Sequence, residues 1–307
     1  MSVRMQVLPV PGHGAEDVVL DDDGQVWTGV RDGWIVRVSP DGRQIERVLT
    51  TEGRPLGLEW LPDGRLLVCD ALRGLLAIDV RTQDIEMLVQ EIDGQPMKFT
   101  NNAAVAPDGT VWFTDSSRDW GIDEWMSDLI EHTCSGRLLR RDPGGTVATV
   151  LDGLAFANGV ALVPGAVVVA ELGLRRLHRV DLTTGAATLL VEGLPGYPDN
   201  ISTGTDGLIW VALAAPTDPV LTHLQQHGAP HIRSLVRRLP DALKPNPKRT
   251  AHVQAYDVDG RRVHDLQADA TDFHMITGVR ENHGRLWLGS LEEPAIAVID
   301  LGTVSAS

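Results

Sequence analysis

The chain has 307 residues, 43% of them hydrophobic, and a formal net charge of −15. This composition suffices for a packed core, and the 31 glycines and 18 prolines suit a turn-rich chain. The acidic balance argues against a nucleic-acid partner because phosphates would be repelled. No stretch approaches the roughly 18 apolar residues of a membrane span, and the first residues lack a signal peptide's apolar core. We therefore expect a cytoplasmic protein that acts on a small molecule; the oligomeric state stays open.

A short motif recurs six times along the chain: DGQVW, DGRLL, DGTVW, PGAVV, DGLIW and HGRLW. Each copy places a glycine turn before a β-branched, aliphatic or aromatic run, as β-hairpins do. Several intervals between the glycines lie near the roughly 40–50-residue period of a propeller blade. The repeats therefore predict an all-β fold, a six-bladed β-propeller, as a single domain over residues 1–307.

The predicted blades follow one another in chain order, at 16–50, 56–90, 101–153, 158–193, 199–268 and 276–301. The last blade is short by one strand. Residues 4–10 alternate in polarity and would supply it, which closes the ring and removes its exposed edges. We expect the repeated tryptophans to pack between blades, and Cys69 and Cys134 to be buried thiols, with a disulfide between them as the alternative. The tryptophans are Trp27, Trp112, Trp210 and Trp287.

Two insertions interrupt the repeats with apolar residues at helical spacing. The first covers about 117–133 in the third blade, and the second covers about 216–249 in the fifth. We predict short helices over one rim of the propeller. The second insertion is a basic island in an acidic chain. A solvated lid is its expected role, and a membrane-surface or partner-docking helix is the alternative.

Counting back from the repeat glycines finds one equivalent position in each blade. A count of eight reaches Glu16, Leu56, Asn101, Asp199 and Ile276, and a count of seven reaches Asn158 in the fourth blade, whose turn is shorter. Equivalent positions at the start of the innermost strands should surround the central channel. Two carboxylates and two amides are thus predicted to face one point.

A bound cation is the simplest explanation of this ring. Without one, Glu16 and Asp199 would repel each other, and burying unpaired charge costs several kcal/mol or forces protonation. Oxygen ligands favour Ca²⁺ first, then Mg²⁺ or Mn²⁺, with Zn²⁺ as a further alternative. A water-bridged polar ring or a purely structural ion would also account for the pattern.

Neighbouring positions supply further candidates. The residues one step along the chain are Asp17, Gly57, Asn102, Gly159, Asn200 and Thr277. Asn102, Asn200, Thr277 and Leu56 could support the ligands or contact substrate, and the counting alone decides between Asn101 and Asn102. Another repeated position, six residues after the motif glycine, holds Asp70, Asp115 and Glu171. We expect these three to form structural hydrogen bonds; lining the channel mouth is the alternative.

Several segments resemble a known superfamily. AEDVVLDDDG, FTNNAAVAPDGTVWFTDSS, FANGVAL and LPGYPDNIS read in order like strictosidine-synthase-like proteins, within the six-bladed propellers that include gluconolactonases, senescence marker protein and paraoxonases. In the lactonase members a divalent cation is held by a glutamate, blade-start asparagines and the aspartate of a PD(N/G) segment. The resemblance assigns these roles to Glu16, Asn101, Asn158 and Asp199.

Two departures limit what the resemblance implies. Leu56 stands where paraoxonases have a histidine, so a histidine-dyad mechanism lacks support. Thr277 aligns with the catalytic glutamate of strictosidine synthase, which argues against amine condensation. The leading hypothesis is a metal-dependent hydrolase of lactones or related esters, with Asp199 as general base. The alternatives are a non-hydrolytic isomerase, cyclase or lyase using the same metal, and a non-enzymatic binding scaffold.

Overall fold

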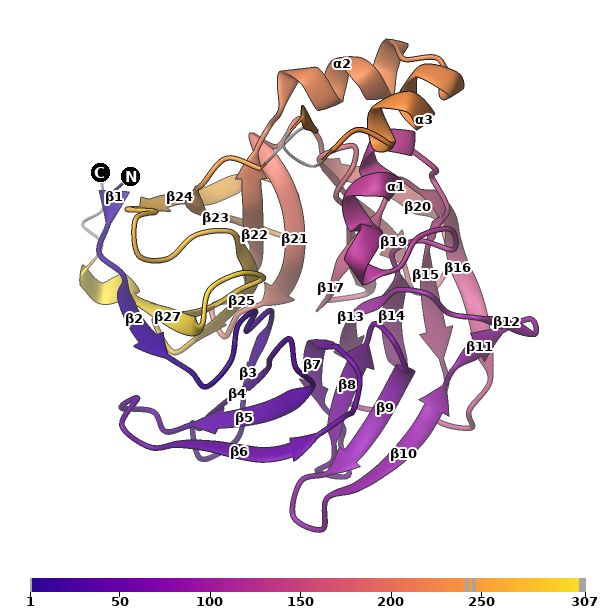
Figure 1. Ribbon diagram of the computed structural model, residues 1–307. Helices are drawn as coiled ribbons and strands as arrows, with labels where there is room; N and C mark the ends of the chain where they lie inside the picture. The colour runs from indigo at the N-terminus through magenta and orange to yellow at the C-terminus, as the bar shows by residue number, and fades with distance from the viewer. Residues whose placement is uncertain (1, 241–242, 245–246, 304–307) are drawn as a thin grey trace.

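The computed structural model describes residues 2–240, 243–244 and 247–303. Its strands form six blade sheets around a central axis and one small two-stranded sheet (Figure 1). Within each sheet, consecutive strands pair as an antiparallel meander. The first strands of adjacent blades contact one another and make the inner wall of the ring. The predicted all-β, six-bladed β-propeller is confirmed. The ends of the predicted domain, residue 1 and residues 304–307, lie outside the described residues.

The first three blades follow the predicted order. Blade 1 contains β3 (Val18–Leu20), β4 (Val26–Gly29), β5 (Trp34–Val38) and β6 (Ile45–Thr50). Blade 2 contains β7 (Pro55–Trp60), β8 (Leu66–Asp70), β9 (Gly74–Asp79) and β10 (Asp84–Val89). A small hairpin follows, of β11 (Glu91–Ile92) and β12 (Gln95–Pro96). Blade 3 contains β13 (Thr100–Val105), β14 (Val111–Asp115), β15 (Gly136–Arg141) and β16 (Val147–Leu154).

The last three blades complete the circle. Blade 4 contains β17 (Ala157–Val163), β18 (Ala166–Glu171), β19 (Arg176–Asp181) and β20 (Ala187–Val191). Blade 5 contains β21 (Gly196–Thr203), β22 (Ile209–Pro216), β23 (Ala251–Tyr256) and β24 (Arg262–Ala268). Blade 6 contains β25 (Ile276–Asn282), β26 (Arg285–Ser290) and β27 (Ala295–Asp300). The short helix η3 (Leu301–Thr303) follows.

The N-terminal segment closes the ring as predicted. Strand β2 (Gln6–Pro9) pairs antiparallel with β27, with Gln6 opposite Val298, and becomes the outermost strand of blade 6. Residues from both ends of the chain therefore share one sheet, which covers the edge that blade 6 would otherwise expose. The preceding β1 (Ser2–Val3) pairs parallel with β24 of blade 5, a contact that the sequence did not indicate.

The core lies between neighbouring blades. Trp27 packs against blade 2, Trp112 against blade 4, and Trp210 and Trp287 against the blades that follow them. All four are buried and lie in second strands, which confirms the predicted packing role. Cys69 is buried and Cys134 is half-buried, and both are free thiols.

The helices gather over one rim of the ring (Figure 1). The first insertion forms η1 (Ile122–Glu124) and α1 (Trp125–Glu131), and the second forms α2 (Pro219–His227) and α3 (Pro230–Arg237). Asp218 caps α2 through its carboxylate, which accepts from Val220 N and Leu221 N. Residues 241–242 and 245–246 of the predicted insertion lie outside the described residues. No helix in the described ranges is long and apolar enough to span a membrane; the expected cytoplasmic location stays a prediction.

Candidate functional site

The innermost strands share a backbone irregularity that positions the ring of side chains at the central channel. In blades 2 to 6 the pairing with the second strand skips between Pro55 and Leu58, Thr100 and Ala103, Ala157 and Val160, Pro198 and Ile201, and Ile276 and Val279. In blade 1 the strand begins only at Val18, so Glu16 and Asp17 also precede the regular pairing. Bulges of this kind redirect side chains next to functional sites. Here they release two residues per blade beside the channel.

The bulges correct one register assignment. The residue of blade 6 at the ring position is Thr277, not Ile276, because the skipped pair in that blade is 277–278. Blade 6 has a two-residue turn between Asn282 and Arg285, like the turn of blade 4, so the count is again seven. Ile276 packs instead in the core between blades 5 and 6.

The structure brings the four predicted ligands onto one pocket. Glu16, Asn101, Asn158 and Asp199 are all buried and line the same cavity, together with Leu56 and Thr277. The cavity encloses about 800 Å³ of space between its lining atoms, including the part open to solvent. Asn102 and Asn200 are buried but do not line it. Thus the register found by counting converges on one place.

Unpartnered oxygen atoms mark the floor of this pocket. Glu16 Oε2, Asn101 Oδ1 and Asn158 Oδ1 are buried without any hydrogen-bond partner, and so is Asn200 Oδ1. Asn101 is held in this orientation because its Nδ2 donates to Ser116 Oγ at 2.9 Å. Buried polar atoms almost always have a partner, so three such oxygens on the pocket and a fourth beside it call for a bound ion or ordered water. Oxygen atoms are the donors that Ca²⁺ prefers, which is why the residues present fit a hard divalent cation.

The carboxylates of the ring are only partly compensated, because the Arg54 guanidinium lowers the pKa of Glu16 by less than burial raises it. Burial is the main cause that raises the pKa of Glu16 well above its ordinary value, and the nearby charges of Asp199 and Asp17 add to it. Burial likewise raises the pKa of Asp199 to about 7, although a hydrogen bond from Asn158 opposes the shift. A cation would stabilise the ionised forms of both groups.

The candidate site contains few acidic side chains and no histidine or cysteine cluster among the described residues. Within the described part of the chain, no group of three or more His, Cys, Asp or Glu side chains is placed to hold a metal ion. The ring instead combines two carboxylates with amide oxygens. That donor set is chemically closer to calcium sites than to zinc sites, which use histidine and cysteine.

The neighbouring positions divide into supports and one additional donor. Asn102 accepts from Val160 N at 3.0 Å and donates to Asp17 Oδ2 at 3.3 Å, so both ends of its amide are used. Asn200 Nδ2 donates to Glu16 Oε1 at 3.0 Å and leaves Oδ1 free. Thr277 Oγ1 donates to the backbone oxygen of Glu16 at 2.7 Å. Thr277 therefore holds the backbone at Glu16, and Asn102 links Asp17 to blade 4. Asn200 keeps a free oxygen beside Glu16, although it does not line the pocket.

Arg54 is a residue near the site that the sequence did not single out. Its guanidinium is buried, donates to Gly14 O at 3.1 Å and has an unpartnered Nη2. Burial lowers the pKa of Arg54 to about 10, and the Glu16 carboxylate opposes that shift. Arg54 is not at a position that repeats from blade to blade, so no sequence pattern pointed to it. Its charge nevertheless belongs to the electrostatics of the ring.

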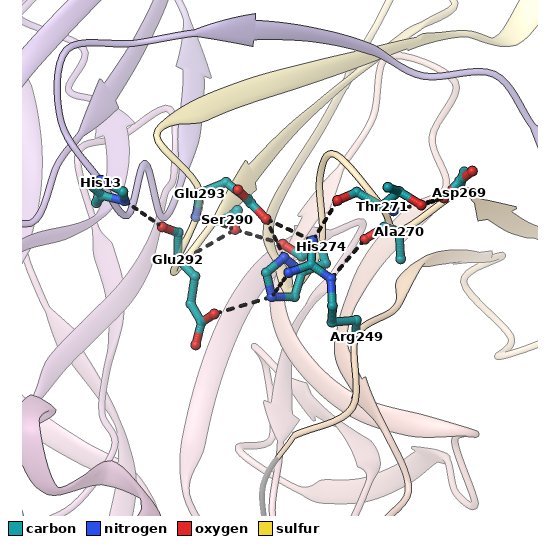
Figure 2. A network of polar contacts seen from close by, with 9 residues as sticks. All are labelled: His13, Arg249, Asp269, Ala270, Thr271, His274, Ser290, Glu292 and Glu293. Carbon is teal, nitrogen blue, oxygen red and sulfur yellow. Dashed lines mark hydrogen bonds and ion pairs between the residues drawn. The ribbon is translucent and has the colours of Figure 1, made fainter.

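A polar network fixes the segment that returns from the second insertion to blade 5. Figure 2 shows the Arg249 guanidinium directed at backbone oxygens of the loop before β25 and lying beside His274. Arg249 donates to Thr271 O at 2.8 Å and to Ala270 O at 3.1 Å, and His274 is paired with Glu293. The residues just before this anchor, Pro247 and Lys248, line the pocket. The network therefore holds one side of the pocket mouth.

Comparisons with known proteins agree with this architecture. A family model described as SMP-30/Gluconolactonase/LRE-like region matches residues 19–229. Protein STRICTOSIDINE SYNTHASE-LIKE 6 of Arabidopsis thaliana is 33% identical over 298 residues, covering 94% of this chain and 79% of that protein. Adipocyte plasma membrane-associated protein of Danio rerio is 34% identical over 310 residues, covering 91% and 73%.

Solved structures extend the likeness at the level of the fold. XC5397 from Xanthomonas campestris, described as a gluconolactonase, aligns with a TM-score of 0.71 at 16% identity, over 97% of this chain and 89% of that one. Regucalcin from Agrobacterium tumefaciens, described as a calcium-binding protein, aligns with a TM-score of 0.68 at 16% identity, over 97% and 94%. At such identities the likeness shows a shared propeller.

Proposed function

Because the chain belongs to the SMP-30/gluconolactonase/LRE-like family, we propose that it is a divalent-cation-dependent hydrolase of lactones or related esters. The observation that carries the proposal is the set of orphaned oxygens of Glu16, Asn101 and Asn158 on the floor of a pocket that also contains Asp199. Structural neighbours described as a gluconolactonase and as a calcium-binding protein support it.

Each part of the site has a role in this chemistry. A bound Ca²⁺ would supply Lewis-acid polarisation of the substrate carbonyl and stabilise negative charge on its oxygen. Glu16, Asn101, Asn158 and Asp199 would hold the cation, with Asn200 as a further donor. Asp199 would accept the proton of the attacking water, since it is one of only two carboxylates in the ring. Thr277 and Ser116 would keep Glu16 and Asn101 in place through the hydrogen bonds described above.

The nature of position 277 separates this proposal from an amine-condensing reaction. Thr277 has no carboxyl group, and its hydroxyl donates to the Glu16 backbone. Two hypotheses compete with this one: non-hydrolytic isomerase, cyclase or lyase chemistry, and a binding scaffold. The experiment described next distinguishes them.

The test uses purified protein, a panel of lactones and aryl esters, and three conditions: untreated, chelated, and chelated then resupplied with Ca²⁺. We expect hydrolysis that is lost on chelation and restored by the cation. Metal binding without hydrolysis of any panel member would favour the non-hydrolytic alternatives. A protein that neither binds a divalent cation nor turns over a substrate would be a scaffold. Repeating the restoration with Mg²⁺, Mn²⁺ and Zn²⁺ identifies the preferred ion.

A further inference from the structure

The pocket above the candidate metal site differs sharply in polarity from its floor. Phe99 and Phe156 meet edge to face on its wall, with ring centroids 5.3 Å apart. Trp125, Met126 and Leu129 contribute from helix α1, and Leu221 contributes from α2. These residues belong to one hydrophobic cluster that joins the inner rim of the blades to the helical insertions. The space beside the candidate metal site is therefore an apolar chamber.

Polar side chains on the wall are few, and Tyr197, Thr217 and Asp218 each already make a hydrogen bond within the protein. The Tyr197 hydroxyl accepts from Asp218 N at 3.2 Å, and Thr217 Oγ1 donates to Pro195 O at 3.1 Å. The Asp218 carboxylate accepts from the first turn of α2. Lys248 is exposed, so it can act only where the pocket meets solvent. The wall leaves few groups to bond a substrate, chiefly the Tyr197 hydroxyl hydrogen and the second oxygen of Asp218. Most hydroxyls of a polyhydroxylated substrate would therefore lose water without gaining equivalent hydrogen bonds on this wall.

The two insertions are coupled to each other as they form this wall. Gln225 of α2 is buried, and its Nε2 donates to Leu129 O of α1 at 2.9 Å. Arg237 of α3 pairs with Glu131 of α1 and lies over the Trp120 ring at 4.7 Å. The helices thus form one packed unit, and its inner side chains determine what fits beside the ring.

We propose that the substrate of this pocket carries an alkyl or aryl body next to the reactive carbonyl, and that sugar lactones are poor substrates. The inference rests on the proposed hydrolysis at the same site and names its substrate class. Met126 and Leu221 are specificity-determining residues, because both line the chamber from the insertions. The polar floor accepts the carbonyl, and the apolar wall accepts the rest.

The first test compares three lactones with one ring size: an unsubstituted δ-lactone, an alkyl-substituted δ-lactone and glucono-δ-lactone. Each buried methylene should raise kcat/KM about fourfold, the equivalent of about 0.8 kcal/mol. Each hydroxyl buried without a partner should lower it at least fivefold, the equivalent of about 1 kcal/mol. The expected order is alkyl above unsubstituted above glucono. The reverse order would overturn the substrate class while leaving the hydrolase proposal intact.

Variants then locate the source of the preference. Met126→Gln keeps the length of a half-buried side chain, and Leu221→Asn replaces a buried one. Each should lower the ratio of kcat/KM for the alkyl over the unsubstituted lactone by roughly tenfold, as expected for removal of a wall contact. Leu235→Asn is the matched control, because Leu235 lies on α3, is 61% exposed and does not line the pocket. An equal change in Leu235→Asn would remove the assignment to the wall.

A binding measurement separates failure of this inference from failure of the proposed function. Trp125 lines the pocket and is one of 8 tryptophans in the chain. A change in tryptophan fluorescence that is absent in Trp125→Phe therefore reports occupancy by the alkyl lactone in the Ca²⁺-loaded protein. If no panel member is hydrolysed but the alkyl lactone binds with clear preference over glucono-δ-lactone, the substrate class stands and the hydrolase proposal fails. If binding shows no such preference, the substrate class fails whatever the turnover.

Discussion

Two sets of buried carboxylates occupy repeated positions in this propeller, and their surroundings differ. At the exits of second strands, Asp70, Asp115 and Glu171 each accept from a backbone N–H that lies 16 residues earlier in the chain. Their remaining bonding capacity goes to side chains such as Thr51, Arg137 and His178. In the channel ring, Glu16 Oε2 instead has no partner. The predicted structural role of the first set is confirmed by these bonds.

Glu171 and Asp199 show the same contrast in their acidity, whereas burial raises the pKa of Asp115 even though Arg137 opposes the shift. Burial opposes ionisation of Glu171, but hydrogen bonds from His178 and Arg176 outweigh it and hold its pKa at about 2. Burial raises the pKa of Asp199 to about 7 with much weaker compensation. The Glu171 carboxylate is thus saturated by its own chain, whereas the Glu16 carboxylate keeps one oxygen without a partner. Repetition marks both sets, and hydrogen-bond saturation tells them apart.

Replacing Asp199 with Asn is expected to give the largest effect. The variant keeps a ligating oxygen and removes the base, so hydrolysis should fall by roughly 10²–10⁴-fold. Calcium occupancy should fall much less, because the other ring oxygens remain. Both quantities are measured on one preparation, by initial rates and by metal analysis. Near-normal turnover in a calcium-loaded variant would remove Asp199 from the mechanism.

Glu171→Gln changes one of the carboxylates at the exits of the second strands instead. Loss of the charge facing Arg176 and His178 should lower the free energy of unfolding by about 3 kcal/mol at pH 7, the usual cost of breaking a buried pair. Because the folded pKa is depressed, this contribution exists above the unfolded pKa of about 4.3 and is lost as the pH falls towards 2. Urea unfolding at pH 7 and pH 4 should therefore show a smaller difference between variant and parent at pH 4.

The variant also serves as a control for the ring. Glu171→Gln should leave calcium affinity and kcat near the parent values, since Glu171 does not line the pocket. A large loss of calcium affinity in a folded Glu171→Gln protein would mean that the two sets of carboxylates are not independent.

Calcium itself should stabilise the fold through the ring. A cation at 100 times its Kd adds about 2.7 kcal/mol to the free energy of unfolding, provided it binds only the folded chain. Thermal unfolding with chelator and with Ca²⁺ measures this difference. The rise in melting temperature on adding Ca²⁺ should vanish in Glu16→Ala and persist in Glu171→Gln. An identical melting temperature with and without Ca²⁺, at concentrations where metal analysis finds it bound, would contradict the site.

The sequence could identify the ring because the blade register is regular, and it could predict closure because residues 4–10 alternate. It could not decide between Asn101 and Asn102. That choice depends on partners in other segments: Ser116 orients Asn101, whereas Val160 N saturates Asn102. A two-residue turn in blade 6 likewise moved the ring position to Thr277, and only the strand pairing revealed it. Contacts between distant segments are not encoded in a local count.

The smallest expected effect concerns the support of one ligand. Ser116 Oγ accepts from Asn101 Nδ2 at 2.9 Å and donates to Ala157 O at 2.6 Å, so it fixes which end of the amide faces the pocket. Ser116→Ala should reduce calcium affinity roughly tenfold, at the low end of the effect of removing a group that orients a ligand.

Ser202→Ala is the matched control for that change. Ser202 is also a buried serine, and its Oγ donates to Val279 O at 2.6 Å in the next blade, but it bonds no ring side chain. Both variants should lose stability in urea unfolding, because each leaves one buried carbonyl oxygen without its hydroxyl donor, and Ser116→Ala should lose more because it also leaves Asn101 Nδ2 without its acceptor. Calorimetric titration with Ca²⁺ should show weaker binding only for Ser116→Ala. Equal affinities in the two variants would mean that Asn101 holds its orientation without Ser116, and that its free oxygen is set by the bulge alone.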